Sequence, residues 1–165
     1  METKSEVPEI AVKIYEILSN FFFDLESYWA LLLHIESLET NDPSRPLWIL
    51  LSNNCLKMAT VEWCKVFGSE NNNKTHYTKC IDQLGVIEET SNEMREFRDK
   101  YISHYDFYSK PIPFMDKAVK IIEEFDQAML AKYETDSQMS TEVYIMHTRE
   151  DIQKRLRSIV GSSRE

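Results

Sequence analysis

The chain has 165 residues, of which 42% are hydrophobic and 28% charged, a balance typical of a globular domain and unlike that of a disordered chain. Its formal net charge of −9 argues against general nucleic-acid binding, because contacts to phosphate need positive charge. The start of the chain is acidic and polar, and the most apolar run, residues 28–33, is too short to span a membrane. We therefore expect a cytoplasmic protein with no membrane partner.

Only 3 glycines and 5 prolines occur, so turns are few and the elements between them are long. No segment alternates apolar and polar residues with a period of two. These features predict one all-α domain over residues 1–165, an up-and-down bundle of five to six helices with no sheet. We expect the tail after about residue 161 to be frayed.

The first predicted helix covers residues 6–39, where apolar residues keep helical spacing. These residues are Ile10, Ile14, Ile17, Leu18, Phe21, Leu25, Tyr28, Leu32, Ile35 and Leu38. Between residues 21 and 33, further apolar side chains such as Phe23 and Trp29 widen the face. A helix that is apolar on more than one side is either central to the fold or packed against another chain. The segment therefore also favours a symmetric homodimer.

Capping residues and helix breakers predict the remaining helices. Ser44 and Pro46 favour a second helix that ends at Gly68, and a third is expected at residues 75–84, ended by Gly85. A fourth runs to about residue 109, where two prolines follow, and a fifth fades near residue 133. The expected caps are Thr90 or Ser91 for the fourth helix and Asp116 for the fifth. A last helical segment follows residue 140, where Thr148 and Asp151 have capping-box spacing.

The three cysteines, Cys55, Cys64 and Cys80, form no disulfide or CxxC pattern, so we interpret them as reduced, buried side chains. A zinc site made by Cys64, His76 and Cys80 is the alternative, but a fourth ligand is not apparent. We therefore expect neither a metal nor a cofactor. Gly-rich phosphate loops, GxSxG and HExxH are also absent from the sequence.

The residues best suited to chemistry lie in the fourth predicted helix. A histidine such as His104 moves protons near neutral pH, an arginine such as Arg98 holds phosphate, and Asp99 is placed to orient either one. On a regular helix, Arg98 and His104 lie about 120° apart and do not share a face. Either the long arginine side chain or a second copy of the helix across a symmetry axis must bring them together.

The residues around this pair resemble the defining motif of the HEPN superfamily. That motif is an arginine, commonly followed by Asn, Asp or His, and then a histidine after four to six intervening residues. The string Phe97-Arg98-Asp99-Lys100-Tyr101-Ile102-Ser103-His104-Tyr105-Asp106 looks closest to the branch linked to bacterial abortive phage infection, the AbiU type. The end of the second predicted helix, Trp63-Cys64-Lys65-Val66-Phe67-Gly68, followed by His76, also looks like that branch.

The resemblance implies a helical bundle that often dimerises, with a composite site where Arg and His of both chains converge. It implies a metal-independent endoribonuclease, often a toxin beside a nucleotidyltransferase-type antitoxin, in which the RNA 2′-hydroxyl attacks the adjacent phosphate. Carried over to this chain, His104 is the acid or base, Arg98 stabilises the phosphorane and Asp99 helps to place them. Lys100 and Tyr105 are the expected RNA-binding neighbours. Non-catalytic family members that bind nucleotides or proteins imply an alternative function.

Three other patterns have a structural interpretation beside the functional one. Phe97, Tyr101, Tyr105 and Tyr108 form a stripe that favours core packing, although aromatic rings also stack on bases. The basic cluster Lys154-Arg155-x-Arg157 is either a solvated face or a phosphate contact. The three tryptophans, Trp29, Trp48 and Trp63, are most simply core anchors. A purely structural adaptor, in which Arg98 and His104 form an internal pair, is the third functional hypothesis.

Overall fold

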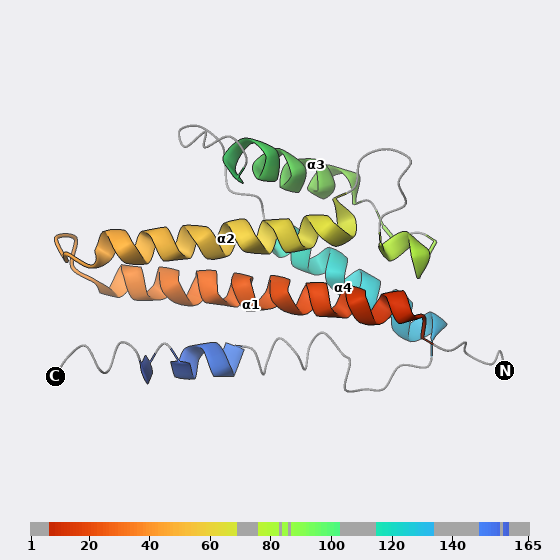
Figure 1. Ribbon diagram of the computed structural model, residues 1–165, viewed down its shortest axis with the longest axis horizontal. Helices are drawn as coiled ribbons and strands as arrows, with labels where there is room; N and C mark the ends of the chain where they lie inside the picture. Colours follow the sequence, from red (N-terminus) through yellow and green to blue (C-terminus); the bar gives the residue numbers. More distant parts are fainter. Residues whose placement is uncertain are drawn as a thin grey trace.

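The computed structural model describes residues 7–68, 76–82, 84–85, 87–102, 115–133, 149–155 and 157–158. These residues form helices and turns without a strand, which confirms the predicted all-α bundle (Figure 1). The helices are α1 (Glu9–Ser37), α2 (Arg45–Phe67), α3 (Glu88–Phe97) and α4 (Met115–Lys132). A 3-10 turn (Tyr77–Lys79) precedes α3, a π-helical turn (Arg98–Ile102) follows it, and residues 149–155 are also helical. Among the described helices, none has the length and apolar character needed to cross a bilayer.

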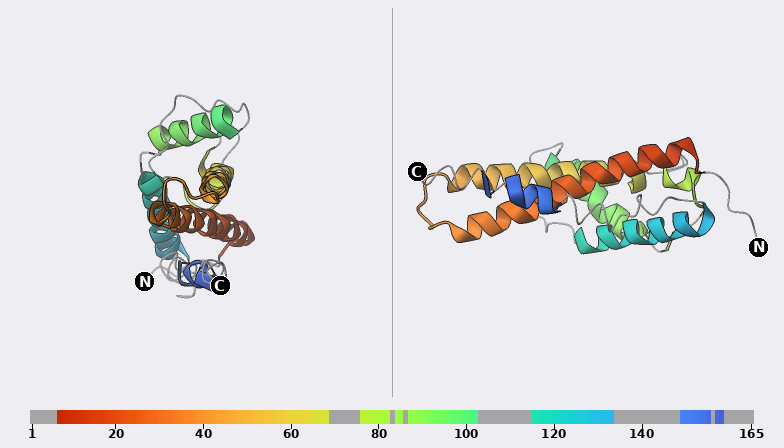
Figure 2. Two further views of the ribbon diagram at one scale, coloured as in Figure 1. Left: turned by 90° about the vertical axis from the view of Figure 1, so that its left-hand side faces the viewer. Right: turned by 90° about the horizontal axis from the view of Figure 1, so that it is seen from below.

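α1 is the central helix of the bundle. Its buried residues occupy several sides of the helix, as their spacing predicts: Ala11, Ile14, Leu18, Phe21, Phe22, Leu25, Glu26, Tyr28, Leu31 and Ile35. Seen end-on, α2, α4 and the segment 149–155 lie around it (Figure 2). The wide apolar face therefore has neighbours within this chain.

α1 and α2 form a long antiparallel hairpin. Arg45 fixes its loop end, and Gly68 closes the end of α2. Arg45 Nη1 donates hydrogen bonds to the carbonyl oxygens of Ile35 (2.7 Å) and Leu38 (3.2 Å), which satisfies acceptors that the end of α1 leaves open. Gly68 ends α2, as predicted, and its N–H donates to the Cys64 carbonyl. A Cβ at Gly68 would lie 2.7 Å from Cys64 Cα, so no larger residue fits this closure.

α4 packs on both helices of the hairpin through aromatic side chains and two directed hydrogen bonds. Trp63, fully buried on α2, donates from Nε1 to the Ala118 carbonyl at 3.2 Å. Tyr15 on α1 donates its hydroxyl to Asp126 Oδ1 at 2.8 Å. The ring of Phe67 lies among those of Trp63, Tyr77 and Phe125, with centroids 5.1, 5.4 and 6.0 Å away. This aromatic cluster is the centre of the core.

Several predicted boundaries are wrong. The third helix expected at residues 75–84 is, in its described part, only the 3-10 turn Tyr77–Lys79. α3 begins at Glu88, so Thr90 and Ser91 lie inside it, and Ser91 Oγ instead donates to the Phe67 carbonyl at 2.9 Å. Asp116 stands in the first turn of α4, which begins one residue earlier.

Trp63 is the only one of the three tryptophans that serves as a buried core anchor, because Trp29 and Trp48 are half-buried. Trp48 lies near the loop end of the hairpin, where its ring meets that of His34 edge-on at 4.8 Å. Trp29 packs at the margin of the core.

Near the hairpin loop, α1 and α2 extend past α3 and α4, so fewer described side chains are available to cover them (Figures 1 and 2).

Two acidic side chains face each other across the α1–α2 seam. Burial and the nearby carboxylate of Glu62 raise the pKa of Asp24 from 3.8 to about 6, and Lys65 opposes this shift in part. Glu62 is itself buried, with Oε1 2.5 Å from Lys65 Nζ and with no described hydrogen-bond partner for Oε2. At neutral pH the ionised carboxylate of Asp24 therefore lies in a partly buried seam beside Glu62 and Lys65.

The raised pKa of Asp24 predicts a contribution to stability that is present at pH 5 and lost at neutral pH. The folded pKa of Asp24 is higher than its unfolded value, so the folded state binds more protons between pH 4 and 6. The contribution of Asp24 to the unfolding free energy should fall as pH rises through that window. Asp24→Asn should remove this part of the slope and stabilise the protein at pH 7 by about 1 kcal/mol, a value discounted for partial exposure.

Urea unfolding of the wild type and Asp24→Asn at pH 5 and pH 7 measures the effect. Glu16→Gln, at an exposed position of the same helix, is the matched control and should not change the slope. Equal pH dependence in the wild type and Asp24→Asn would contradict the prediction.

Candidate functional site

The predicted motif begins where α3 changes from an α-helix to a π-helical turn. Met94 and Phe97 are buried in the core, which fixes the inner face of α3. The next residues, Arg98, Asp99 and Lys100, form most of the π-helical turn and reach the surface. π-helical turns are uncommon and frequently occur at functional sites. The sequence pattern did not predict this turn, because it continued a regular helix to residue 109.

Arg98 and Asp99 form an ion pair. Arg98 Nε donates to Asp99 Oδ1 at 2.7 Å, and the side chains are 34% and 53% exposed. A guanidinium carries five N–H donors in a fork, the geometry that suits an oxyanion. Lys100 pairs with Glu96 one turn earlier and is exposed. The structure therefore places Asp99 where it holds the Arg98 side chain in one direction.

The site lies against the end of α2. Cys64 is buried there, and burial raises the pKa of its thiol to about 11. The positive charges of Arg98 and Arg95 oppose this shift, whereas Asp99 adds to it. The arginines of α3 and of the π-helical turn are thus close enough to act electrostatically on a side chain of α2, and Cys64 is too deeply buried to serve as a nucleophile.

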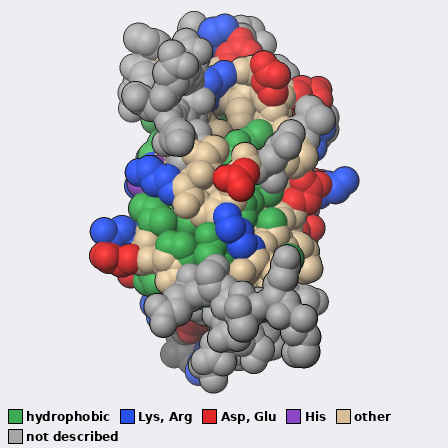
Figure 3. Space-filling view, turned by 90° about the vertical axis from the view of Figure 1, so that its right-hand side faces the viewer, with side chains coloured by type: hydrophobic (Ala, Val, Ile, Leu, Met, Phe, Trp, Pro, Cys, Tyr) green, Lys and Arg blue, Asp and Glu red, His purple; other side chains and the backbone are tan. Residues whose placement is uncertain are grey.

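Acidic side chains balance the basic ones around the motif. Between residues 88 and 102 there are five acidic residues and three basic ones. Lys117 of α4 lies 3.4 Å from Glu89 and 3.6 Å from Glu93, which ties α4 to α3 by two weak ion pairs. On the face shown in Figure 3, the described Lys and Arg side chains are interspersed with Asp and Glu around apolar patches. This view shows the end of the molecule at which α3 begins, and the π-helical turn lies at the other end of α3 (Figure 1).

The other half of the predicted site, His104 and Tyr105, lies outside the described residues, as do Phe107 and Tyr108. The meeting of Arg98 with His104 therefore stays a prediction. No three His, Cys, Asp or Glu side chains come together as a metal site among the residues that the structure describes. Cys55, Cys64 and Cys80 are free thiols.

Sequence reasoning missed a second polar site, on the other side of the molecule from α3. Glu26 of α1 is only 5% exposed and accepts two hydrogen bonds from Arg149, from Nε and Nη2, each at 2.8 Å. These bonds keep the pKa of Arg149 above its usual value. The signal in the sequence was an acidic residue within an apolar helix face, but its partner stands 123 positions away.

Comparisons of this chain with protein-family models, with curated proteins and with solved structures gave no match.

The environment of Cys64 predicts that its thiol is protected in the folded protein. With a pKa of about 11, roughly 0.1% of the thiol is ionised at pH 8, and burial also blocks access. In iodoacetamide labelling followed by peptide mass spectrometry, half-buried Cys55 should react before Cys64 and Cys80. All three should react at similar rates in urea. Fast labelling of Cys64 in the native protein would mean that α3 does not cover the end of α2.

Proposed function

We propose that this chain is a HEPN-type, metal-independent endoribonuclease that acts as a homodimer, in the manner of a toxin of a toxin–antitoxin or phage-defence system. The observation that carries the proposal is the ion pair of Arg98 and Asp99 on the π-helical turn. This ion pair orients the partly exposed guanidinium of Arg98, which belongs to the Arg98-Asp99-x-x-x-x-His104 motif. The all-α bundle is consistent with that family.

The proposed reaction is an intramolecular transesterification of RNA. The 2′-oxygen attacks the adjacent phosphorus, the bond from phosphorus to the 5′-oxygen breaks, and the products carry a 2′,3′-cyclic phosphate and a 5′-hydroxyl. One proton leaves the 2′-hydroxyl and one reaches the 5′-oxygen, and His104 serves as base or acid in these transfers. Arg98 stabilises the negative charge of the phosphorane, and Asp99 keeps its guanidinium in position.

Two copies would supply the groups that one copy lacks. A single His104 performs one of the two proton transfers well, whereas two symmetry-related motifs provide a base and an acid. Lys100 and Tyr105, beside the motif, would bind the flanking nucleotides. A nucleotidyltransferase-type antitoxin is the proposed partner that keeps the site inactive.

A non-catalytic module that binds a nucleotide or a partner protein is the second candidate. The charge around α3 favours it, because five acidic residues between positions 88 and 102 repel a phosphate backbone. In that case Asp99 neutralises Arg98, and the surface meets a protein rather than RNA.

Variants of the motif separate the two candidates. In the nuclease, Arg98→Ala and His104→Ala should each lower RNA cleavage by about 10²–10⁴-fold and keep the helical circular dichroism signal. Asp99→Asn should reduce cleavage less, because Asp99 only orients Arg98. Cleavage should persist in EDTA and fail on a strand with a 2′-deoxy residue at the cleaved position.

Lys120→Ala, a change of an exposed cation on α4, is the matched control and should leave cleavage unchanged. Analytical ultracentrifugation of each variant checks that the dimer persists. A wild-type protein that cuts no RNA, alone or after separation from a co-purified antitoxin, would exclude the nuclease and leave the binding module. A lower melting temperature without any change in activity would instead assign Arg98 and His104 to an internal structural pair.

A further inference from the structure

A cavity that is about half open to solvent lies between α1 and the helical segment near the C-terminus. Its volume is about 500 Å³, within the usual range for ligand pockets. We propose that it binds an aromatic monoanion, that is, a flat apolar body carrying one carboxylate, sulfonate or phosphate ester. This site is separate from the Arg98 motif and does not depend on the proposed nuclease.

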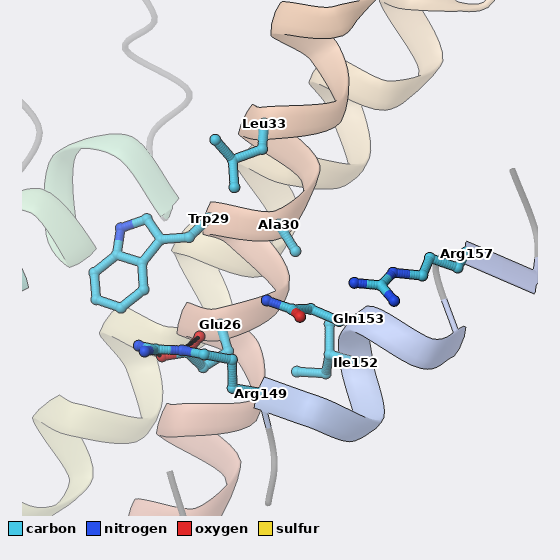
Figure 4. Close-up of a pocket in the computed structure, with 8 residues that line it drawn as sticks. All are labelled: Glu26, Trp29, Ala30, Leu33, Arg149, Ile152, Gln153 and Arg157. Carbon is cyan, nitrogen blue, oxygen red and sulfur yellow. Dashed lines mark hydrogen bonds and ion pairs between the residues drawn. The ribbon is translucent and has the colours of Figure 1, made fainter. Parts of the chain in front are cut away.

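The walls of the cavity supply the apolar half of this recognition. Trp29 and Ala30 lie on one turn of α1 and Leu33 lies on the next, and Ile152 lines the cavity from the helical segment (Figure 4). Trp29 is half-buried, and its indole borders the cavity. Flat indole surfaces favour stacking with another aromatic ring. An aromatic body would therefore cover apolar area that the two helices leave in contact with water.

The polar lining of the cavity has a surplus of one positive charge. Glu26 binds Arg149 through two hydrogen bonds, so these two charges cancel. Arg157 is exposed and extends from the helical segment toward α1, and Gln153 adds an amide beside it (Figure 4). Among the described residues that line the cavity, Glu26 is the one acid. A guanidinium beside an apolar wall is suited to a single oxyanion, because it is weakly hydrated and donates in a fork.

The charge count also selects against other ligands. The positive charge of Arg157 would repel a cation. A polyanion would bring more negative charge than this guanidinium neutralises. The chain as a whole carries a net charge of −9, which repels polyanions further. A neutral aromatic molecule would gain the apolar contacts but not the ionic one, so it should bind more weakly.

Titration with 8-anilinonaphthalene-1-sulfonate tests the site, because this probe is aromatic, singly negative and fluorescent in apolar surroundings. The wild type should bind it at one saturable site. Arg157→Gln should weaken binding by about tenfold or more, the loss expected for one charge-assisted contact. Arg155→Gln is the matched control in the same segment, where Arg155 pairs with Asp151 at 2.8 Å, and it should bind as the wild type does.

Two further arms place the probe in the cavity. Ala30→Trp fills the cavity and should abolish binding. Leu33→Asp adds a negative charge at a position that is 67% exposed, and it should weaken binding. This second variant keeps the test valid if Ala30→Trp does not fold. N-phenyl-1-naphthylamine, which lacks the sulfonate, should bind more weakly and be insensitive to Arg157→Gln. The proposal is overturned if the sulfonate probe binds Arg157→Gln and Leu33→Asp as it binds the wild type, because it then occupies another apolar surface.

Discussion

Apolar side chains surround most of the circumference of α1, and one neighbouring helix cannot shield such a surface from water. α2 covers one side along the length of the hairpin, α4 a second and the segment 149–155 a third (Figure 2). Two polar contacts lie within these seams, Tyr15 with Asp126 and Glu26 with Arg149, and each fixes where a neighbour meets α1. α3 then packs on α2, so the position of Arg98 depends on α1 through two layers of packing.

The sequence predicts the elements whose signal is local. The apolar spacing of residues 6–39 is specific enough to place α1 within three residues at each end, and Gly68 marks the end of α2. The errors arise where a tertiary contact outweighs a local preference. Ser91 looks like a helix cap, but its hydroxyl bonds to the carbonyl of Phe67, 24 positions away. Residues 77–84 have helical apolar spacing, yet Cys80 and Ile81 are buried after a single 3-10 turn.

The candidate site is predictable to a smaller extent. Residue chemistry identified Arg98 and Asp99, and the structure brings these two together at the surface. The π-helical turn was not predictable, because no residue type specifies it and a regular helix fits the same letters. The ion pair of Glu26 and Arg149 was not predictable for another reason. Its partners are far apart in the chain, so the pair produces no periodic pattern in the sequence. Only the folded bundle shows that the buried Glu26 has a cation beside it.

The two ends of the hairpin are held to different extents. α1 has 29 residues and is therefore about 43 Å long, and its loop end extends beyond α3 and α4. Leu47, Leu50 and Leu51 are exposed at this end of α2. The aromatic cluster of Trp63, Phe67 and Phe125 holds the other end of the hairpin, and the ion pair of Glu26 with Arg149 holds α1 between the two ends. The loop end is therefore the part of the hairpin that the described bundle constrains least.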